Sequence, residues 1–134
     1  YFQHWLDVGA KIEAGGHKLP SIYCVNWFRK DEAGKFVWPG YGDNMRVLKW
    51  MIDRLEGQAQ GQETMFGVTP TYGELNWTGL NFTADQFKTV TSIDKAAWQQ
   101  ELQLHTTHFE QLAYNMPKAL LDTKAALEQR LAAV

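Results

Sequence analysis

The clearest helical pattern in the chain lies between residues 43 and 57. Apolar residues recur there at the spacing of one helix face, at Val47, Leu48, Met51, Ile52 and Leu55. Asp43 or Asn44 is a suitable N-cap, and Gly57 is a suitable stop. The pattern therefore predicts an amphipathic helix that begins near Asn44 and ends just before Gly57.

Two further helices follow from residue 83 onward. Thr83 and Gln86 have the spacing of a capping box, which predicts a short helix to about Val90. Ser92 or Asp94 then opens a longer helix with one continuous, mainly apolar stripe, formed by Trp98, Leu102, His105, Phe109 and Leu112. We expect this stripe to face a core that the last helix shares.

Helical patterns also occupy both ends of the chain. Residues 1–13 form an amphipathic pattern that the run Ala14-Gly15-Gly16 ends. Pro117 is well placed at a first helical position, and the helix that follows is lined by Leu120, Leu127, Leu131 and Val134. The chain opens with Tyr1 and not with Met, inside a helical pattern, so we interpret it as a piece of a longer protein or a processed one.

Extended structure is predicted in two short places. Residues 21–28 are rich in β-branched and aromatic residues, which is typical of a strand, and residues 36–38 continue extended beyond a charged turn. A shorter extended piece is plausible over residues 64–69, where Pro70 ends it. The fold class predicted is therefore α+β, mostly helical with a short sheet portion.

Composition and charge exclude several classes of function. The net charge is −2 and no run approaches the ~18 apolar residues of a membrane span, so we expect neither a nucleic-acid partner nor a membrane. Cys24 is the only cysteine, which excludes an internal disulfide and favours a reducing compartment such as the cytoplasm. We expect Cys24 itself to be buried and inert within the predicted strand.

The chemistry of the chain concentrates in residues 27–41. Five aromatic residues fall within fifteen positions, with glycines between them: Trp27, Phe28, Phe36, Trp38 and Tyr41. Ring faces beside backbone amides suit a nucleobase, which offers a π-face and a polar edge. Aromatic clusters in strands are more often core, however, so the pattern alone leaves both interpretations open.

No other motif in the chain indicates a catalytic or metal centre. The chain has no Walker A sequence, and the glycines around Tyr41 do not complete a dinucleotide-binding fingerprint. Glu101, His105 and His108 have a spacing that can hold a metal on one helix face, but no second helix offers a matching set. We therefore predict no catalytic residue and no metal ligand in this chain.

Residues 25–48 read VNWFRKDEAGKFVWPGYGDNMRVL. This run closely resembles a signature of GTP-dependent phosphoenolpyruvate carboxykinases, whose pattern is VNWFRKDxxGKFxWPGFGENSRVL. The departures are Tyr41 for Phe, Asp43 for Glu and Met45 for Ser, of which Met45 removes a small hydroxyl beside the site. The likeness extends to Tyr1–Leu6 and, more loosely, to the helical tail. It therefore covers essentially the whole chain and implies the C-terminal part of the carboxykinase α/β fold.

The resemblance implies a guanine-binding role for this segment. Phe28 and Tyr41 would sandwich the base and Phe36 would close its edge, while Asn44 and the backbone of Tyr41-Gly42-Asp43 would supply hydrogen bonds. The implied GTP site thus comprises Phe28, Phe36, Tyr41, Gly42, Asp43 and Asn44. The chain is taken as one C-terminal segment, 1–134, with a strand and guanine-binding loop at 21–45 and a helical remainder at 46–134.

What the resemblance implies for the whole enzyme is conversion of oxaloacetate and GTP to phosphoenolpyruvate, CO₂ and GDP in gluconeogenesis. Mn²⁺ or Mg²⁺, the phosphate-binding loop and the catalytic groups would lie outside this chain, in the remainder of a monomeric carboxykinase. We therefore expect the 134-residue chain alone to be inactive. The alternatives are a stand-alone helical interaction module with an aromatic core and an aromatic platform for single-stranded RNA, which the near-neutral charge disfavours.

Overall fold

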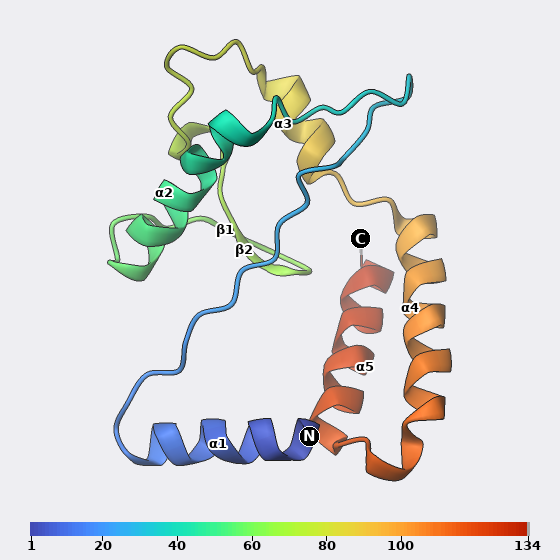
Figure 1. Cartoon of the computed structure of the whole chain (residues 1–134). Coiled ribbons are helices and arrows are strands. Elements are labelled where there is room, and N and C mark those ends of the chain that lie inside the picture. Colours follow the sequence, from blue (N-terminus) through green and yellow to red (C-terminus); the bar gives the residue numbers. More distant parts are fainter. Residues whose placement is uncertain (134) are drawn as a thin grey trace. The chain divides into compact units, whose positions relative to one another are not determined.

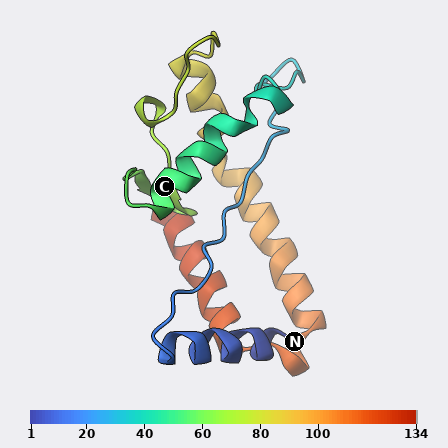
Figure 2. The same cartoon turned by 60° about the vertical axis from the view of Figure 1, so that its left-hand side comes forward.

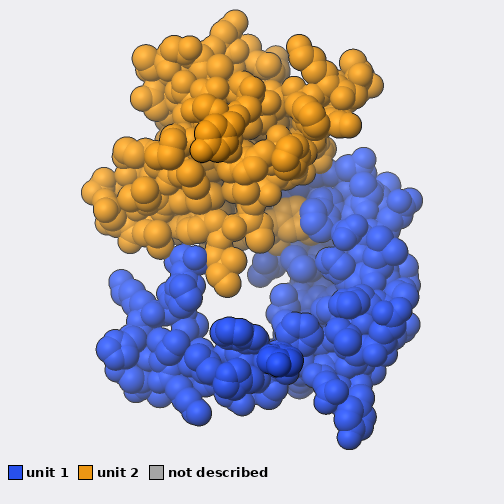
Figure 3. All heavy atoms as spheres, in the orientation of Figure 1, with its two compact units in different colours: residues 1–21, 93–134 blue, residues 22–92 orange. Residues whose placement is uncertain are grey.

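A computed structural model describes residues 1–133, so the predicted role of Val134 lies outside the described residues. The chain forms two compact units: residues 1–21 with 93–134, and residues 22–92 (Figure 3). Helices account for 56% of the residues and the sheet has two strands, which confirms a mostly helical α+β chain. Within residues 1–133, every helix is too short or too polar to cross a membrane.

The first unit contains both ends of the chain. It comprises α1 (Phe2–Ala14), α4 (Lys95–Gln111) and α5 (Lys118–Ala133), with a 3-10 turn at Ala113–Asn115 between the last two. Helices α4 and α5 lie side by side and antiparallel in both views (Figures 1 and 2). Leu102 of α4 and Leu131 of α5 are buried. The predicted stripes therefore do face a shared core.

The second unit holds α2 (Asn44–Leu55), the strands β1 (Gln62–Thr64) and β2 (Gly67–Thr69), and α3 (Ala84–Thr91). The strands form an antiparallel hairpin in which Glu63 lies opposite Val68. The predicted extended piece at 64–69 is thus two short strands with a turn. The buried side chains that hold this unit together are Trp38, Trp50, Leu75, Phe82 and Phe87.

The helix ends follow the local signals of the sequence. Thr83 and Gln86 form the predicted capping box at the start of α3, and each side chain bonds the other residue's backbone N–H. The Asp94 side chain accepts a hydrogen bond of 2.9 Å from the N–H of Ala97 at the start of α4. Pro117 lies immediately before α5, one position earlier than predicted. Caps depend on residues close in sequence, so the sequence predicts them well.

The predicted strand at residues 21–28 is wrong. Residues 21–26 have no regular secondary structure, and among residues 1–133 the segment after them contributes only an isolated bridge between Lys30 and Phe36. A β-rich composition favours extended backbone, but a strand also needs a neighbour that supplies N–H and C=O groups. The prediction for Cys24 fails for the same reason, because its side chain is exposed.

The apolar stripe of α2 is only partly turned toward the core. Trp50 is the buried residue of this helix, with Val47 and Met51 half-buried beside it. Leu48, Ile52 and Leu55 were predicted to be part of the same stripe but are exposed. The large Trp50 ring therefore decides which side of α2 faces the core, and a second apolar face remains uncovered within the described chain.

A close, half-buried contact fixes the loop that leads into the hairpin. Gly61 has φ +69°, and a Cβ placed there would lie 2.6 Å from Val68 Cγ1 and 2.9 Å from the Thr69 carbonyl oxygen. The side chain of Glu74 accepts hydrogen bonds from the N–H groups of Gln60 (3.1 Å) and Gly61 (2.6 Å). A glycine and one carboxylate together hold this loop against the rest of the unit.

Glu74 also binds the segment that follows the hairpin. Its second carboxylate oxygen accepts from the N–H of Thr71 (2.8 Å) and from the Thr71 hydroxyl (2.9 Å). These donors, led by the N–H groups of Thr71 and Gly61, lower the pKa of Glu74 to about 2. The carboxylate therefore ties two loops together in its ionised form.

Candidate functional site

The candidate site begins with a tight turn that brings two phenylalanines together. The N–H of Asp31 donates to the Lys35 carbonyl and the N–H of Val37 donates to the Arg29 carbonyl, both at 2.9 Å. An Asp31 side-chain oxygen also accepts from the N–H of Lys35 at 2.9 Å. This reversal of the chain places the rings of Phe28 and Phe36 with their centroids 5.9 Å apart in an edge-to-face pair.

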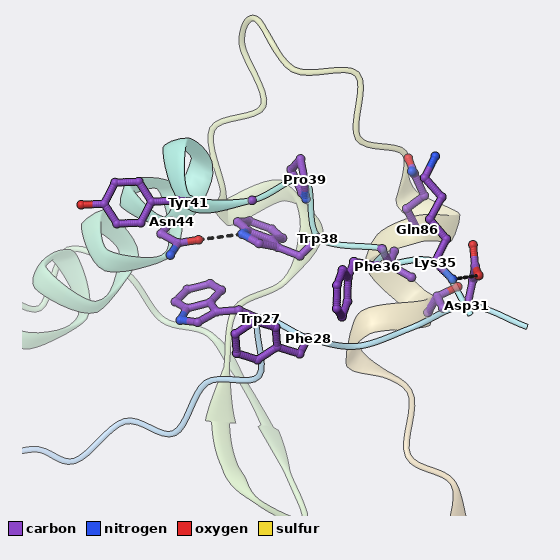
Figure 4. Close-up of a pocket in the computed structure, with 13 residues that line it drawn as sticks. Trp27, Phe28, Asp31, Lys35, Phe36, Trp38, Pro39, Tyr41, Asn44 and Gln86 are labelled. Atoms are coloured by element: carbon purple, nitrogen blue, oxygen red, sulfur yellow. Dashed lines mark hydrogen bonds between the residues drawn. The ribbon is translucent and has the colours of Figure 1, made fainter. Parts of the chain in front are cut away.

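These rings form one side of a pocket of about 890 Å³ in the second unit (Figure 4). The pocket extends from the turn, along the segment 36–41, to the beginning of α2 and to one side of α3. Its lining residues are Trp27, Phe28, Asp31, Lys35, Phe36, Val37, Trp38, Pro39, Gly40, Tyr41, Asn44, Gln86 and Thr89. All of them lie within residues 22–92.

Burial divides the aromatic cluster of the sequence into two groups. Trp38 is only 7% exposed and packs on Trp27 with a centroid distance of 5.6 Å, so these two rings serve the core. Phe28, Phe36 and Tyr41 are 71%, 51% and 93% exposed. Large apolar rings exposed around one concave surface are typical of a binding site. Burial thus assigns Trp27 and Trp38 to the core and leaves Phe28, Phe36 and Tyr41 as the candidate binding residues.

Asn44 supplies the polar group at the other side of the pocket. Its side-chain oxygen accepts a 2.8 Å hydrogen bond from the indole N–H of Trp38 (Figure 4). Gly40 has φ +130°, a conformation that favours glycine, and it leads into the 3-10 turn Tyr41–Asp43 that precedes Asn44. The turn and the bond from Trp38 together set the position of the Asn44 amide.

Four of the six predicted site residues line this pocket and two do not. Phe28, Phe36, Tyr41 and Asn44 belong to the lining, whereas Gly42 and Asp43 are not part of it. The Tyr41 ring points away from the pair formed by Phe28 and Phe36 (Figure 4). In this structure, therefore, no ring of Tyr41 closes the pocket opposite Phe28.

Asp43 has a structural role in the same turn. Its carboxylate forms an ion pair with Arg46, with Oδ1 2.8 Å from Nε. The Arg46 guanidinium also donates to the carbonyls of Asn76 and Thr78. The pair thereby ties the beginning of α2 to the loop after the hairpin, which stabilises one side of the pocket.

Gln86 and Thr89 are pocket residues that the sequence did not indicate. They come from α3, about forty residues after Asn44, and close the pocket beside the turn at Lys35. Gln86 was recognised only as a capping residue, and its Oε1 does accept from the N–H of Thr83 at 2.8 Å. No local pattern could show that α3 packs here, because that depends on Phe87 entering the core.

Charged groups around the pocket are few. The Lys30 ammonium lies 5.2 Å from the centre of the Phe36 ring, a cation–π arrangement. Among residues 1–133, no three His, Cys, Asp or Glu side chains are grouped so as to hold a metal ion. His105 lies 3.4 Å from Glu101 on α4, as their spacing suggested, but as a pair only.

Comparison with known proteins gives a consistent result along the chain. The sequence model of a family described as "Phosphoenolpyruvate carboxykinase C-terminal P-loop domain" matches residues 1–130. Similar curated proteins are named phosphoenolpyruvate carboxykinase [GTP]. One from Anaeromyxobacter sp. (strain K) is 46% identical over 99% of this chain, and one from Treponema pallidum (strain Nichols) is 42% identical over 98%. The chain spans only 22% and 21% of the length of these relatives.

Proposed function

Because this chain belongs to the GTP-dependent phosphoenolpyruvate carboxykinase family, we propose that its aromatic pocket binds the guanine base of GTP. The observation that carries the proposal is the set of exposed rings, Phe28, Phe36 and Tyr41, around a pocket that also contains the Asn44 amide. Ring faces bind the face of a base, and an amide at the edge distinguishes one base from another.

In the proposed complex the base stacks on Phe28, and Phe36 contacts its edge. Tyr41 completes the stack from the opposite face, which requires its exposed side chain to rotate toward the pocket. The rotation costs little because the ring is 93% exposed and has free choice among side-chain rotamers. Gly42 and Asp43 take part through their backbone, which precedes Asn44 at the beginning of α2.

We propose that the whole enzyme converts oxaloacetate and GTP to phosphoenolpyruvate, CO₂ and GDP. A divalent metal, Mn²⁺ or Mg²⁺, would neutralise charge on the phosphates there. The share of this chain is to choose the nucleotide and to orient its triphosphate toward the reacting groups. We propose that the chain alone is inactive, because it spans only about a fifth of the length of its relatives. The single cysteine supports a cytoplasmic enzyme, and we propose that the enzyme is monomeric.

The exposed face of α2 supports a second part of the proposal. Met45, Leu48, Ile52 and Leu55 are all exposed and recur at i, i+3, i+7 and i+10, on one side of the helix. An apolar helix face of this kind is normally covered. We propose that the remainder of the carboxykinase covers it, because the relatives of this chain are about five times longer.

A substitution at Phe28 tests the proposed pocket in the full-length enzyme. Phe28→Ala removes one stacking face and should lower kcat/KM for GTP, ITP and ATP alike, by roughly ten- to a hundredfold. Tyr41→Phe keeps the ring and should change little. Unchanged kinetics in Phe28→Ala would mean that the rings do not bind the base, and an interaction module would then be the better interpretation. Such a module would also show no binding of GTP in a titration.

A further inference from the structure

The turn at residues 29–37 places Lys30 directly opposite Phe36. The two residues form an isolated antiparallel bridge, and the backbone hydrogen bonds of that bridge belong to the residues on either side of them. Lys30 and Phe36 are therefore a non-hydrogen-bonded pair, the arrangement in which opposite side chains come closest. The backbone of the turn thus puts the Lys30 side chain beside the Phe36 ring.

The Phe36 ring has two neighbours of different kinds. The Lys30 ammonium lies over the ring, 5.2 Å from its centre. The Phe28 ring meets it edge to face, with the two centroids 5.9 Å apart. A cation and a second aromatic ring thereby contact Phe36 at the same end of the pocket (Figure 4).

Core packing restrains Phe36 only in part, because its side chain is 51% exposed. A side chain occupies one of a few staggered rotamers, and an exposed ring selects among them by the contacts that it makes. Since the face of an aromatic ring attracts a cation, the ammonium favours the rotamer that turns this face toward Lys30. A ring that is held in one orientation before a ligand binds loses less conformational freedom on binding.

Building on the proposed guanine site, we infer that Lys30 is a positioning residue whose ammonium holds the Phe36 ring in the orientation that contacts the base. Lys30 itself does not belong to the residues that line the pocket, so it acts through the ring and not on the nucleotide. A ring contact is common to all bases. Lys30 therefore sets the affinity of the pocket without changing its preference among nucleotides.

The test is GTP binding by the full-length enzyme carrying Lys30→Met, which removes the ammonium and keeps an unbranched apolar side chain. We expect the Kd for GTP, measured by isothermal titration calorimetry, to rise about two- to fivefold, as for an exposed cation–π contact. The Kd values for ITP and ATP should rise by the same factor, and kcat at saturating GTP should not change. Lys30→Arg keeps a cation over the ring and should restore the affinity.

A double-mutant cycle with Phe36→Leu separates this role from attraction of the phosphates by the positive charge. Leucine keeps an apolar side chain but has no ring face. If Lys30 acts through the ring, Lys30→Met should change the Kd by less than about 1.5-fold once Phe36 is replaced. Lys49→Met is the matched control for loss of a charge, because Lys49 is an exposed lysine of α2 outside the pocket lining, and it should leave the Kd unchanged.

The outcomes distinguish the inference from the proposed site. If Phe28→Ala weakens the nucleotides but Lys30→Met leaves the Kd for GTP within about 1.5-fold of wild type, the positioning role is overturned and the site stands. An equal loss with phenylalanine or leucine at position 36 would also overturn it, since the charge would then act on the phosphates. A loss in Lys30→Arg as large as in Lys30→Met would count against it in the same way. If Phe28→Ala has no effect, both proposals fall.

Discussion

At the scale of single residues, burial separates side chains that look equivalent in the sequence. Trp38 and Phe36 are two positions apart in one aromatic run, yet Trp38 packs edge to face against two rings from far along the chain, Trp77 and Phe82, while Phe36 remains half exposed. The sequence predicted a cluster at this place. It could not predict which rings were buried, because that depends on residues about forty positions away.

Gly61→Ala should destabilise the second unit. The new Cβ would lie within 3.0 Å of three atoms, at Val68, Thr69 and Trp50, on a backbone with φ +69°. Strain and overpacking of this kind cost about 1–3 kcal/mol in the free energy of unfolding, which urea denaturation measures.

Gly73→Ala is the matched control for this prediction. Gly73 has ordinary backbone angles and no atom within 4 Å of a new Cβ. Its unfolding free energy should therefore stay within about 0.5 kcal/mol of wild type. Equal effects of the two substitutions would show that the close approach at Gly61 does not matter for stability.

Glu74→Gln should destabilise the chain in a pH-dependent way. The pKa of Glu74 in the folded state is about 2, below the ordinary 4.5, so the ionised carboxylate stabilises the fold above pH 4.5. That contribution is lost as the pH falls toward 2. At pH 7 the variant should lose about 1–2 kcal/mol of unfolding free energy, because an amide accepts fewer hydrogen bonds than a carboxylate.

The difference between wild type and Glu74→Gln should therefore shrink between pH 5 and pH 2. Urea denaturation of both proteins across this range measures it. Glu63→Gln is the control, since Glu63 is exposed on β1 and its replacement should change the free energy of unfolding little. If the difference in unfolding free energy between wild type and Glu74→Gln stayed constant across this pH range, the ionised Glu74 carboxylate would not be the source of the stabilisation.

At the scale of elements, the sequence predicted helices better than strands. The Thr83 cap of α3 and the apolar periodicity of α4 are local signals. Each of them specifies its helix without reference to the rest of the chain. The segment 21–28 has the composition of a strand but pairs with no neighbouring strand among residues 1–133. The residues of α3 that reach the pocket, Gln86 and Thr89, were missed because helix packing is equally non-local.

The pairing of α4 with α5 can be tested with two leucines on α4. Leu102 is 4% exposed and Leu104 is 63% exposed, although they lie two positions apart. Leu102→Ala should cost about 2–5 kcal/mol in the free energy of unfolding, as a buried cavity does. Leu104→Ala should be close to neutral. Thermal unfolding of both variants, followed by circular dichroism, measures the contrast. Similar losses of stability in the two variants would contradict the burial of the Leu102 face of α4.

At the scale of the whole molecule, most of the affinity for GTP should lie outside this chain. Stacking contributes about 1–3 kcal/mol per base, whereas a Kd of 1 mM corresponds to about 4 kcal/mol. The 134-residue chain should therefore bind GTP at millimolar affinity or weaker. Isothermal titration calorimetry measures this directly, and a micromolar Kd would show that the pocket alone holds the nucleotide firmly.

The division of the chain has a consequence for how nucleotide preference can be inherited. Every residue that lines the pocket falls within one uninterrupted stretch, 22–92, while both ends of the chain belong to the other unit. The proposed base site is thus encoded by one stretch with two junctions, near Ser21 and Ser92. A single recombination of that stretch between relatives would carry the rings, the Asn44 amide and Trp38 together. The proposed site would then be transferred as one piece.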